Sequence, residues 1–224
     1  MFAPGWTNYC VAFAVFFASH MILVRPPVRP ILVRSLSERG FQIGYSLLSI
    51  GILYWLIDAA QTAPYIELWP WAGWQNWIPI IVMGPVCLIG ALAIGTPNPF
   101  SFGGWKNDSF NPQKPGIVRW MRHPILVALF LWSAAHIVPN GNLAHVILFG
   151  AFALFSLLGM RILDRRQKRI LGEKWFDFHR RTDKISLFRA IGTRVLLMRS
   201  AIGLLVYITL AYLHPMITDV FPFE

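Results

Sequence analysis

Long apolar stretches alternate with short polar or basic segments along the whole chain. Each stretch approaches the ~20 residues that an α-helix needs to cross a bilayer, where only internal hydrogen bonds satisfy its backbone. The pattern predicts six membrane-spanning helices, over residues 7–24, 41–60, 77–96, 122–138, 143–163 and 197–214. No domain boundary or internal repeat interrupts the series, so we expect a single all-α domain over residues 1–224.

A different pattern follows the fifth stretch. The run "DRRQKRILGEKWFDFHRR" places Ile170, Leu171, Trp175 and Phe178 near one helical face among dense charges. This spacing predicts a basic amphipathic helix within residues 164–195, lying on the inner membrane surface. The loop "GTPNPFSFGGWKNDSFNPQKPGIVRW" is rich in Gly, Pro and Asn, and its length indicates a functional flap.

Charge placement orients the predicted helices. The twenty Lys and Arg residues fall in three segments: residues 25–39 hold four, 106–122 hold four and 161–199 hold twelve. Six helices bring these segments to one side of the membrane, which the positive-inside rule makes cytoplasmic. We therefore expect both termini to be periplasmic in a bacterial inner-membrane protein.

Composition agrees with a membrane class. The chain is 56% hydrophobic and only 13% charged, too apolar for an ordinary soluble domain. Its formal net charge of +10 fits attraction to anionic lipid headgroups, so the expected partner is the bilayer rather than nucleic acid.

Three of the six histidines fall in or beside apolar stretches: His20, His123 and His136. An ionisable side chain within a bilayer costs free energy, so it indicates a functional site. Imidazole binds transition metals and is a common axial ligand of haem iron. His20 and His136, on different predicted helices, are therefore candidates for gripping one haem. The alternative is that each only hydrogen-bonds a backbone carbonyl or a serine.

Helical geometry separates His123 from His136. Thirteen residues leave the two about 140° apart around a straight helix, so only one is expected to contact a given ligand. Counted along the helices, His20 lies ~7 Å from the inner face and His136 about 20 Å from it. Either the fourth helix begins further back, near Gly116, or His123 is the partner of His20.

Two segments closely resemble the NnrU family of bacterial membrane proteins. They are "RHPILVALFLWSAAHIVPNGNLAHVILFGAF" and "DRRQKRILGEKWFDFHRRT". The family's RHP, LW…AH…NG, DRR and G-E-x-W…RT motifs occur in order, and His20 with the following Pro- and Arg-rich turn and "SERG" also fits. The resemblance covers nearly the whole chain.

The resemblance implies several expectations. Bacterial members are associated with denitrification and nitric oxide metabolism, while the related 15-cis-zeta-carotene isomerases bind haem b and isomerise a carotenoid double bond. The haem ligands of that branch correspond here to His20 and His136. A hydrophobic substrate, nitric oxide and a partner membrane protein are the corresponding expected ligands. Four arginines are candidates for pairing with haem propionates: Arg119, Arg122, Arg165 and Arg166.

The sequence is also compatible with two functions other than haem binding. One is a non-catalytic membrane partner that assists a respiratory or denitrification complex. The other is a membrane methyltransferase, since RHP with a downstream acidic residue is similar to enzymes that hold S-adenosylmethionine at the cytoplasmic face. Those enzymes have a glutamate pair where this chain has "LDRRQK", with Asp164 alone.

Overall fold

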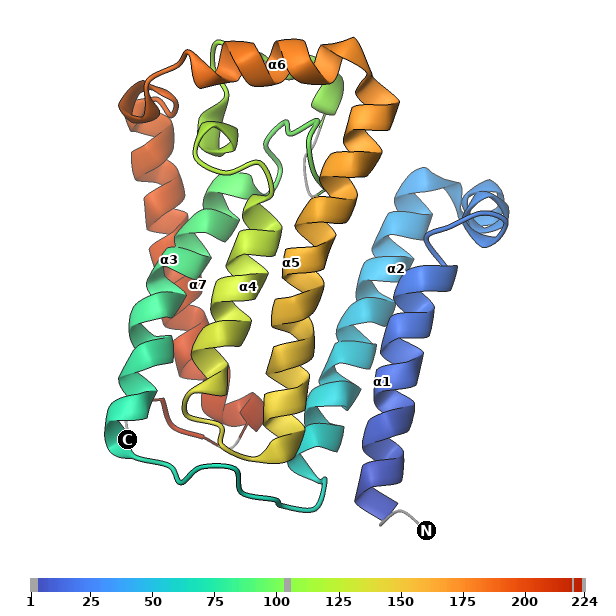
Figure 1. The fold of residues 1–224 in the computed structure, drawn as a ribbon, viewed down its shortest axis with the longest axis vertical. Coiled ribbons are helices and arrows are strands. Elements are labelled where there is room, and N and C mark those ends of the chain that lie inside the picture. The colour runs from blue at the N-terminus through green and yellow to red at the C-terminus, as the bar shows by residue number, and fades with distance from the viewer. Residues whose placement is uncertain (1–3, 103–105, 219, 223–224) are drawn as a thin grey trace. The chain divides into compact units, whose positions relative to one another are not determined.

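The computed structural model describes residues 4–102, 106–218 and 220–222 (Figure 1). Within these ranges every long regular element is an α-helix, which confirms the all-α prediction. The helices are α1 (Pro4–Ile22), α2 (Val28–Gln61), α3 (Trp77–Ala93), α4 (Pro124–Ile137), α5 (Leu143–Leu171), α6 (Glu173–Asp183) and α7 (Thr193–Thr218). Short 3-10 turns lie at η1 (Gly73–Asn76), η2 (Asn107–Ser109), η3 (Gly116–Arg119) and η4 (Leu187–Arg189).

Each of the six predicted stretches coincides with a helix to within three residues at its predicted ends or lies inside one, but the helices differ in length. Four segments are long and apolar enough to cross a membrane: Val28–Gln61, Gly73–Ala93, Leu143–Leu171 and Thr193–Met216. The 14 residues of α4 rise only about 21 Å, against ~30 Å of bilayer hydrocarbon. The structure thus confirms a membrane-type helical protein, and six complete crossings stay a prediction.

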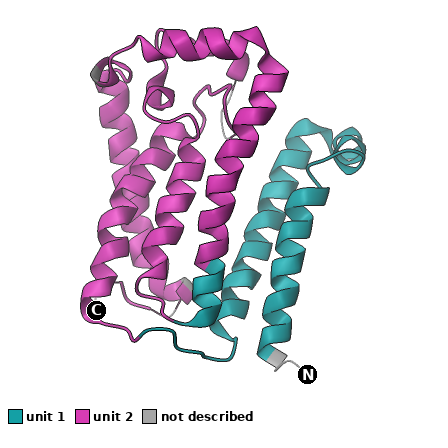
Figure 2. Ribbon diagram, in the orientation of Figure 1, with its two compact units in different colours: residues 1–69, 142–148 teal, residues 70–141, 149–224 magenta. Residues whose placement is uncertain are grey.

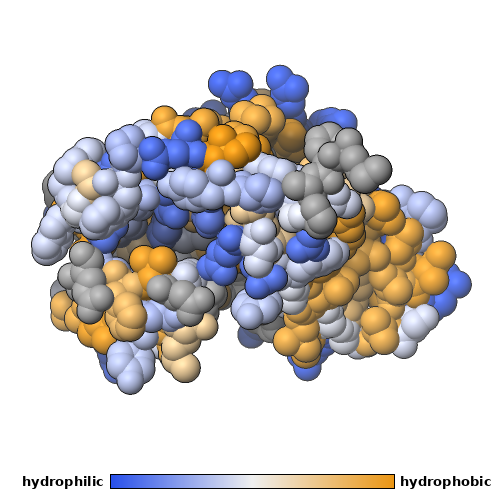
Figure 3. Space-filling view, turned by 90° about the horizontal axis from the view of Figure 1, so that it is seen from below, coloured by the Kyte–Doolittle hydropathy of each residue, from blue (hydrophilic) through white to orange (hydrophobic). Residues whose placement is uncertain are grey.

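Apolar side chains cover broad areas of the molecular surface, which appear orange in the end view of Figure 3. On α7 they include Leu197, Leu204 and Tyr212, which are 66%, 59% and 80% exposed. Large exposed apolar faces are unfavourable in water and are normal where lipid chains contact the helix.

The chain divides into two compact units (Figure 2). Unit 1 comprises residues 1–69 and 142–148, and unit 2 comprises residues 70–141 and 149–224. In unit 1, α1 packs along α2, and the Trp55 indole donates a 3.1 Å hydrogen bond to the Asn8 amide oxygen. The Tyr9 hydroxyl donates to the Ala144 carbonyl at 2.5 Å and so ties α1 to the first turn of α5.

Unit 2 holds α3, α4, α7 and most of α5 side by side, with α6 across one end (Figure 1). Close approach depends on small residues, as is common between membrane helices. A Cβ atom at Gly203 of α7 would lie 3.0 Å from Leu88 Cα of α3, and one at Gly159 of α5 would lie 3.3 Å from Leu126 Cδ1 of α4. Arg199 donates to the Ala91 and Ile94 carbonyls, which completes the end of α3.

The basic segment after the fifth stretch is not one helix over residues 164–195. Residues up to Leu171 continue α5, and Gly172 then breaks the helix with a φ of +54°. Trp175 of α6 is 5% exposed and packs with Phe100, Phe110 and Val118 instead of facing lipid. Ile170, predicted on the same apolar face, is 63% exposed, because the break at Gly172 separates it from α6.

The predicted flap forms the layer on which α6 packs. Asn98 is 3% exposed and its amide donates to the Arg122 carbonyl at 2.9 Å, while its own backbone N–H donates to Asn107 Oδ1. These bonds hold the loop against the segment that precedes α4. Residues 103–105 of the predicted flap lie outside the described residues.

Candidate functional site

A cluster of charged side chains lies at the end of unit 2 that carries α6. Arg122, just before α4, donates two hydrogen bonds to Asp164 of α5, from Nε to Oδ1 at 3.2 Å and from Nη2 to Oδ2 at 2.8 Å. His123 Nε2 lies 3.0 Å from Asp164 Oδ1. One carboxylate therefore holds both the arginine and the histidine of the RHP motif, and a bidentate arginine–carboxylate pair fixes orientation as well as charge.

The same cluster extends through α6. Arg122 Nη1 lies 3.4 Å from His179 Nε2, and His179 Nδ1 lies 2.8 Å from Asp183 Oδ2. Because a guanidinium only donates, His179 Nε2 is the acceptor, so the proton of the neutral ring is on Nδ1 and is donated to Asp183. Arg119 Nη1 lies 3.7 Å from Asp183 Oδ1, while Arg119 Nε donates to the Ile185 carbonyl at 2.6 Å.

His123 is the most buried member, with 4% exposure. Burial lowers the pKa of His123, and the neighbouring Asp164 carboxylate opposes that shift. Its Nε2 carries the proton given to Asp164, so Nδ1 is an acceptor, and it is buried without a hydrogen-bond partner among the described residues.

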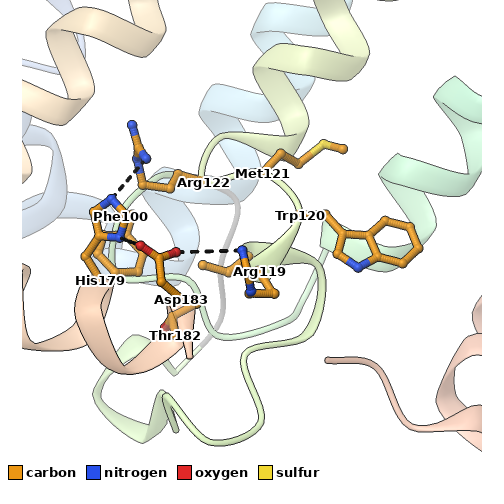
Figure 4. A pocket seen from close by; sticks show the side chains of 9 residues that line it. Phe100, Arg119, Trp120, Met121, Arg122, His179, Thr182 and Asp183 are labelled. Atoms are coloured by element: carbon orange, nitrogen blue, oxygen red, sulfur yellow. Dashed lines mark hydrogen bonds and ion pairs between the residues drawn. The ribbon is translucent and has the colours of Figure 1, made fainter. Parts of the chain in front are cut away.

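A cavity of about 200 Å³ opens beside the cluster (Figure 4). Residues of the segment before α4 and of α6 form most of its wall: Phe100, Val118, Arg119, Trp120, Met121, Arg122, His179, Thr182 and Asp183. In Figure 4, Arg119, Asp183 and His179 lie along one side, whereas the Trp120 ring points away from them. Its indole donates to the Leu187 carbonyl at 2.9 Å.

The sequence found part of this cluster. Arg119 and Arg122 line the cavity, whereas the predicted Arg165 is exposed on α5. His179, which was not among the candidate histidines, is 31% exposed and joins the cluster. Asp164, at the place of the glutamate pair, was the only acidic residue that the sequence linked to RHP. No sequence pattern pointed to Asp183 or Thr182.

His136 lies in a different setting, inside α4. Its Nδ1 is 2.7 Å from the Trp132 carbonyl one turn earlier, and a carbonyl only accepts, so Nδ1 carries the proton. The ring centroid lies 5.4 Å from Trp132 and 5.3 Å from Phe149. Its Nε2 is then the unprotonated nitrogen, and it has no hydrogen bond to the described residues.

His20 repeats this arrangement in unit 1. Its Nδ1 is 2.8 Å from the Phe16 carbonyl one turn earlier and 3.2 Å from the Ser19 hydroxyl, which are the bonds of the alternative in which the imidazole holds only a carbonyl or a serine. Its ring stacks on Phe16 with centroids 4.2 Å apart. The Tyr45 ring of α2 makes an edge-to-face contact with the His20 ring, with centroids 5.7 Å apart. His20 Nε2 likewise makes no hydrogen bond to the described part of the chain.

The proposed backward extension of α4 to Gly116 is wrong. Residues Gly116–Arg119 form a separate 3-10 turn, Gly116 has a φ of +61°, and α4 begins at Pro124. Proline has no N–H to donate to a carbonyl of a preceding helical turn. At the first helical position this N–H would have no intrahelical partner, so proline suits that position. His123, the reserve partner for His20, is the residue before that proline and is bound to Asp164.

Comparison with protein-family models gives a match over nearly the whole chain. The family model described as NnrU protein matches residues 9–222, nearly the whole chain. No curated protein and no solved structure matches it.

Proposed function

The chain belongs to the NnrU family, and from that premise we propose that it is a haem b protein of the bacterial inner membrane. In this proposal His20 and His136 would hold the haem iron. Both termini face the periplasm, and the basic segments face the cytoplasm.

The observation that carries the proposal is the shared state of the two imidazoles. Each gives its Nδ1 proton to the carbonyl four residues earlier, at 2.8 Å for His20 and 2.7 Å for His136. Metal-binding histidines commonly donate their other ring N–H to a carbonyl or carboxylate, which fixes the tautomer and the ring orientation. Nε2 then keeps its lone pair for the metal, as the haem iron requires.

The remaining groups fit the cofactor to different degrees. The aromatic rings beside each histidine give the apolar surroundings that a porphyrin favours. The described residues contain no group of three or more His, Cys, Asp and Glu side chains for a metal ion, but haem takes only axial ligands from the protein. Arg119, Arg122, Arg165 and Arg166 remain predicted partners of the propionates, although Arg122 already donates to Asp164.

The proposed chemistry follows from this cofactor class. Haem supplies redox reactivity, and the protein sets its ligands and the access to it. We propose nitric oxide or a polyene with a cis double bond as substrate, linked to denitrification or to isomerisation. Both molecules dissolve in a bilayer and reach an intramembrane site without crossing water.

An absorption spectrum tests the proposal. The full chain, expressed with sufficient haem and extracted in detergent, is expected to show a Soret band with one haem per chain. Replacing His20 or His136 by Ala removes an axial ligand, so the band shifts or is lost. His123→Gln is the matched control, because His123 Nε2 is bound to the Asp164 carboxylate. A Soret band unchanged in both ligand variants would refute the assignment.

A colourless protein would distinguish the rivals. Binding of S-adenosylmethionine by that protein would favour a methyltransferase, in which Arg122 and His123 with Asp164 are the resembling residues. Binding of neither ligand would favour a non-catalytic partner of a respiratory or denitrification complex.

A further inference from the structure

Arg119 has unused hydrogen-bond donors at the cavity wall. Its side chain is 23% exposed and its Nε donates to the Ile185 carbonyl. The two terminal nitrogens make no hydrogen bond to the described residues, since the nearest carboxylate oxygen, on Asp183, is 3.7 Å away. Arg122 differs, because its Nε, Nη1 and Nη2 all have partners.

Thr182 adds a second unused group to the same wall. The residue is 3% exposed, lines the cavity, and its hydroxyl has no partner among the described residues. A buried hydroxyl without a partner costs about 1–3 kcal/mol, so such groups normally meet a ligand or water. Within the described part of the chain, Arg119 therefore has free donors beside the cavity, and Thr182 has a free hydroxyl that can donate or accept.

From these contacts we propose that this cavity binds a phosphate group, held by the Arg119 guanidinium and the Thr182 hydroxyl. A phosphate can accept a bidentate pair from arginine on two of its oxygens and a further bond from threonine on a third, in a tetrahedral arrangement. The volume of about 200 Å³ is several times the ~30 Å³ that one water occupies, so a tetrahedral oxyanion fits.

The charge around the cavity supports an anionic ligand. Two arginines, Arg119 and Arg122, line the cavity with one carboxylate, Asp183. Asp183 is the one acidic side chain of the wall, and it is 53% exposed. It competes with phosphate for Arg119, so its neutralisation is expected to tighten binding.

The phosphate has two chemical sources. The cavity lies where α6 crosses the helix ends, at the level expected for lipid headgroups, so the phosphodiester of an anionic lipid can enter it. A soluble phosphate ester can enter the same cavity from the aqueous side. The recognition chemistry is the same in both cases.

The test measures both sources with the full chain. Inorganic phosphate binding to delipidated protein in detergent is followed by calorimetry. Retention of phosphatidylglycerol is followed by native mass spectrometry after reconstitution in phosphatidylcholine vesicles that contain this lipid. Phosphate binding assigns a soluble source, lipid retention alone assigns a headgroup, and either outcome supports the site.

Four variants make the test specific. Arg119→Gln is expected to weaken binding about tenfold or more, and Thr182→Val about threefold or more, as each removes a hydrogen bond to a charged ligand. Asp183→Asn is expected to tighten it by a similar factor. Arg194→Gln, which removes one exposed positive charge on α7, is the control and leaves binding within about twofold.

Three results would overturn the site. One is equal binding by the Arg119→Gln and Arg194→Gln variants, and another is no binding of either probe by the unmodified chain. The third is loss of haem from Arg119→Gln with phosphate binding unchanged, since Arg119 would then serve a propionate. If Arg119→Gln folds poorly, tighter phosphate binding by Asp183→Asn still supports the site, and unchanged binding by that variant contradicts it.

Discussion

Two histidines at opposite ends of α4 form hydrogen bonds through different ring nitrogens. His123 precedes Pro124, is 4% exposed and gives its Nε2 proton to the Asp164 carboxylate. His136, thirteen residues later and about 20 Å along the helix, gives its Nδ1 proton to a backbone carbonyl of its own helix. The Nε2 atom of His123 is bound to a carboxylate. The His136 ring is oriented through Nδ1, so its Nε2 keeps a free lone pair.

The difference shows why residue type alone does not define a ligand. An imidazole whose Nε2 is already bound to a carboxylate must break that bond before it can hold a metal through the same atom. An imidazole held through Nδ1 on its own helix is oriented at no such cost. This contrast favours His136 over His123 as the partner of His20 in the proposed haem site.

Removal of the carboxylate at the polar end gives the largest expected effect. Asp164→Asn leaves Arg122 and His123 without their shared anion, and we expect a loss of about 2–3 kcal/mol in the free energy of unfolding. This is less than for a fully buried pair, because Arg122 and Asp164 are 37% and 23% exposed. Unfolding by denaturant in mixed micelles measures the change.

Asp177→Asn on α6 provides the comparison for that loss. Asp177 pairs with Arg181 at 3.0 Å on an exposed helix face, so its removal is expected to cost less than about 0.5 kcal/mol. Equal losses from the two substitutions would show that the cluster around Asp164 is an ordinary surface network.

A pH titration gives the next, smaller effect. Burial lowers the pKa of His123 below the value near 6.5 that it has in an unfolded chain, so the unfolded state binds its proton first. The free energy of unfolding is therefore expected to fall as the pH decreases from about 6.5 toward the lowered pKa. His123→Gln should flatten this part of the curve, and an unchanged slope would contradict the buried neutral ring.

A substitution one turn before His136 gives the smallest expected effect. Ser133 is fully buried, but its hydroxyl donates only to the Leu129 carbonyl of the same helix. Such intrahelical bonds contribute little, so Ser133→Ala is expected to change the free energy of unfolding by less than about 0.5 kcal/mol and to leave any haem spectrum unaltered. A changed spectrum would place Ser133 against the cofactor.

The helices were the predictable part of this molecule. Apolar length and the basic segments located every long helix, since hydrophobic runs and turn residues are local signals. The predicted range 122–138 was close to α4, and only the alternative start near Gly116 was wrong. The structure instead uses Gly116, with its positive φ, and Pro124 to form a separate turn.

The polar cluster was the less predictable part. The bonds of Arg122 and His123 to Asp164 join residues about forty positions apart, and no periodicity in a single sequence reports such a pairing. His179 and Thr182 line the cavity because the break at Gly172 turns α6 across the helix ends, and the sequence pattern did not predict this turn. The histidines within the helices were recognised because their chemistry conflicts with their apolar surroundings.

The most direct test of the account compares the two histidines of α4 in one spectrum. His136→Gln and His123→Gln are purified side by side with the unmodified chain, and the Soret band is normalised to protein. The account predicts that His136→Gln shifts or loses the band, while His123→Gln keeps it. Loss in His123→Gln with retention in His136→Gln would contradict it.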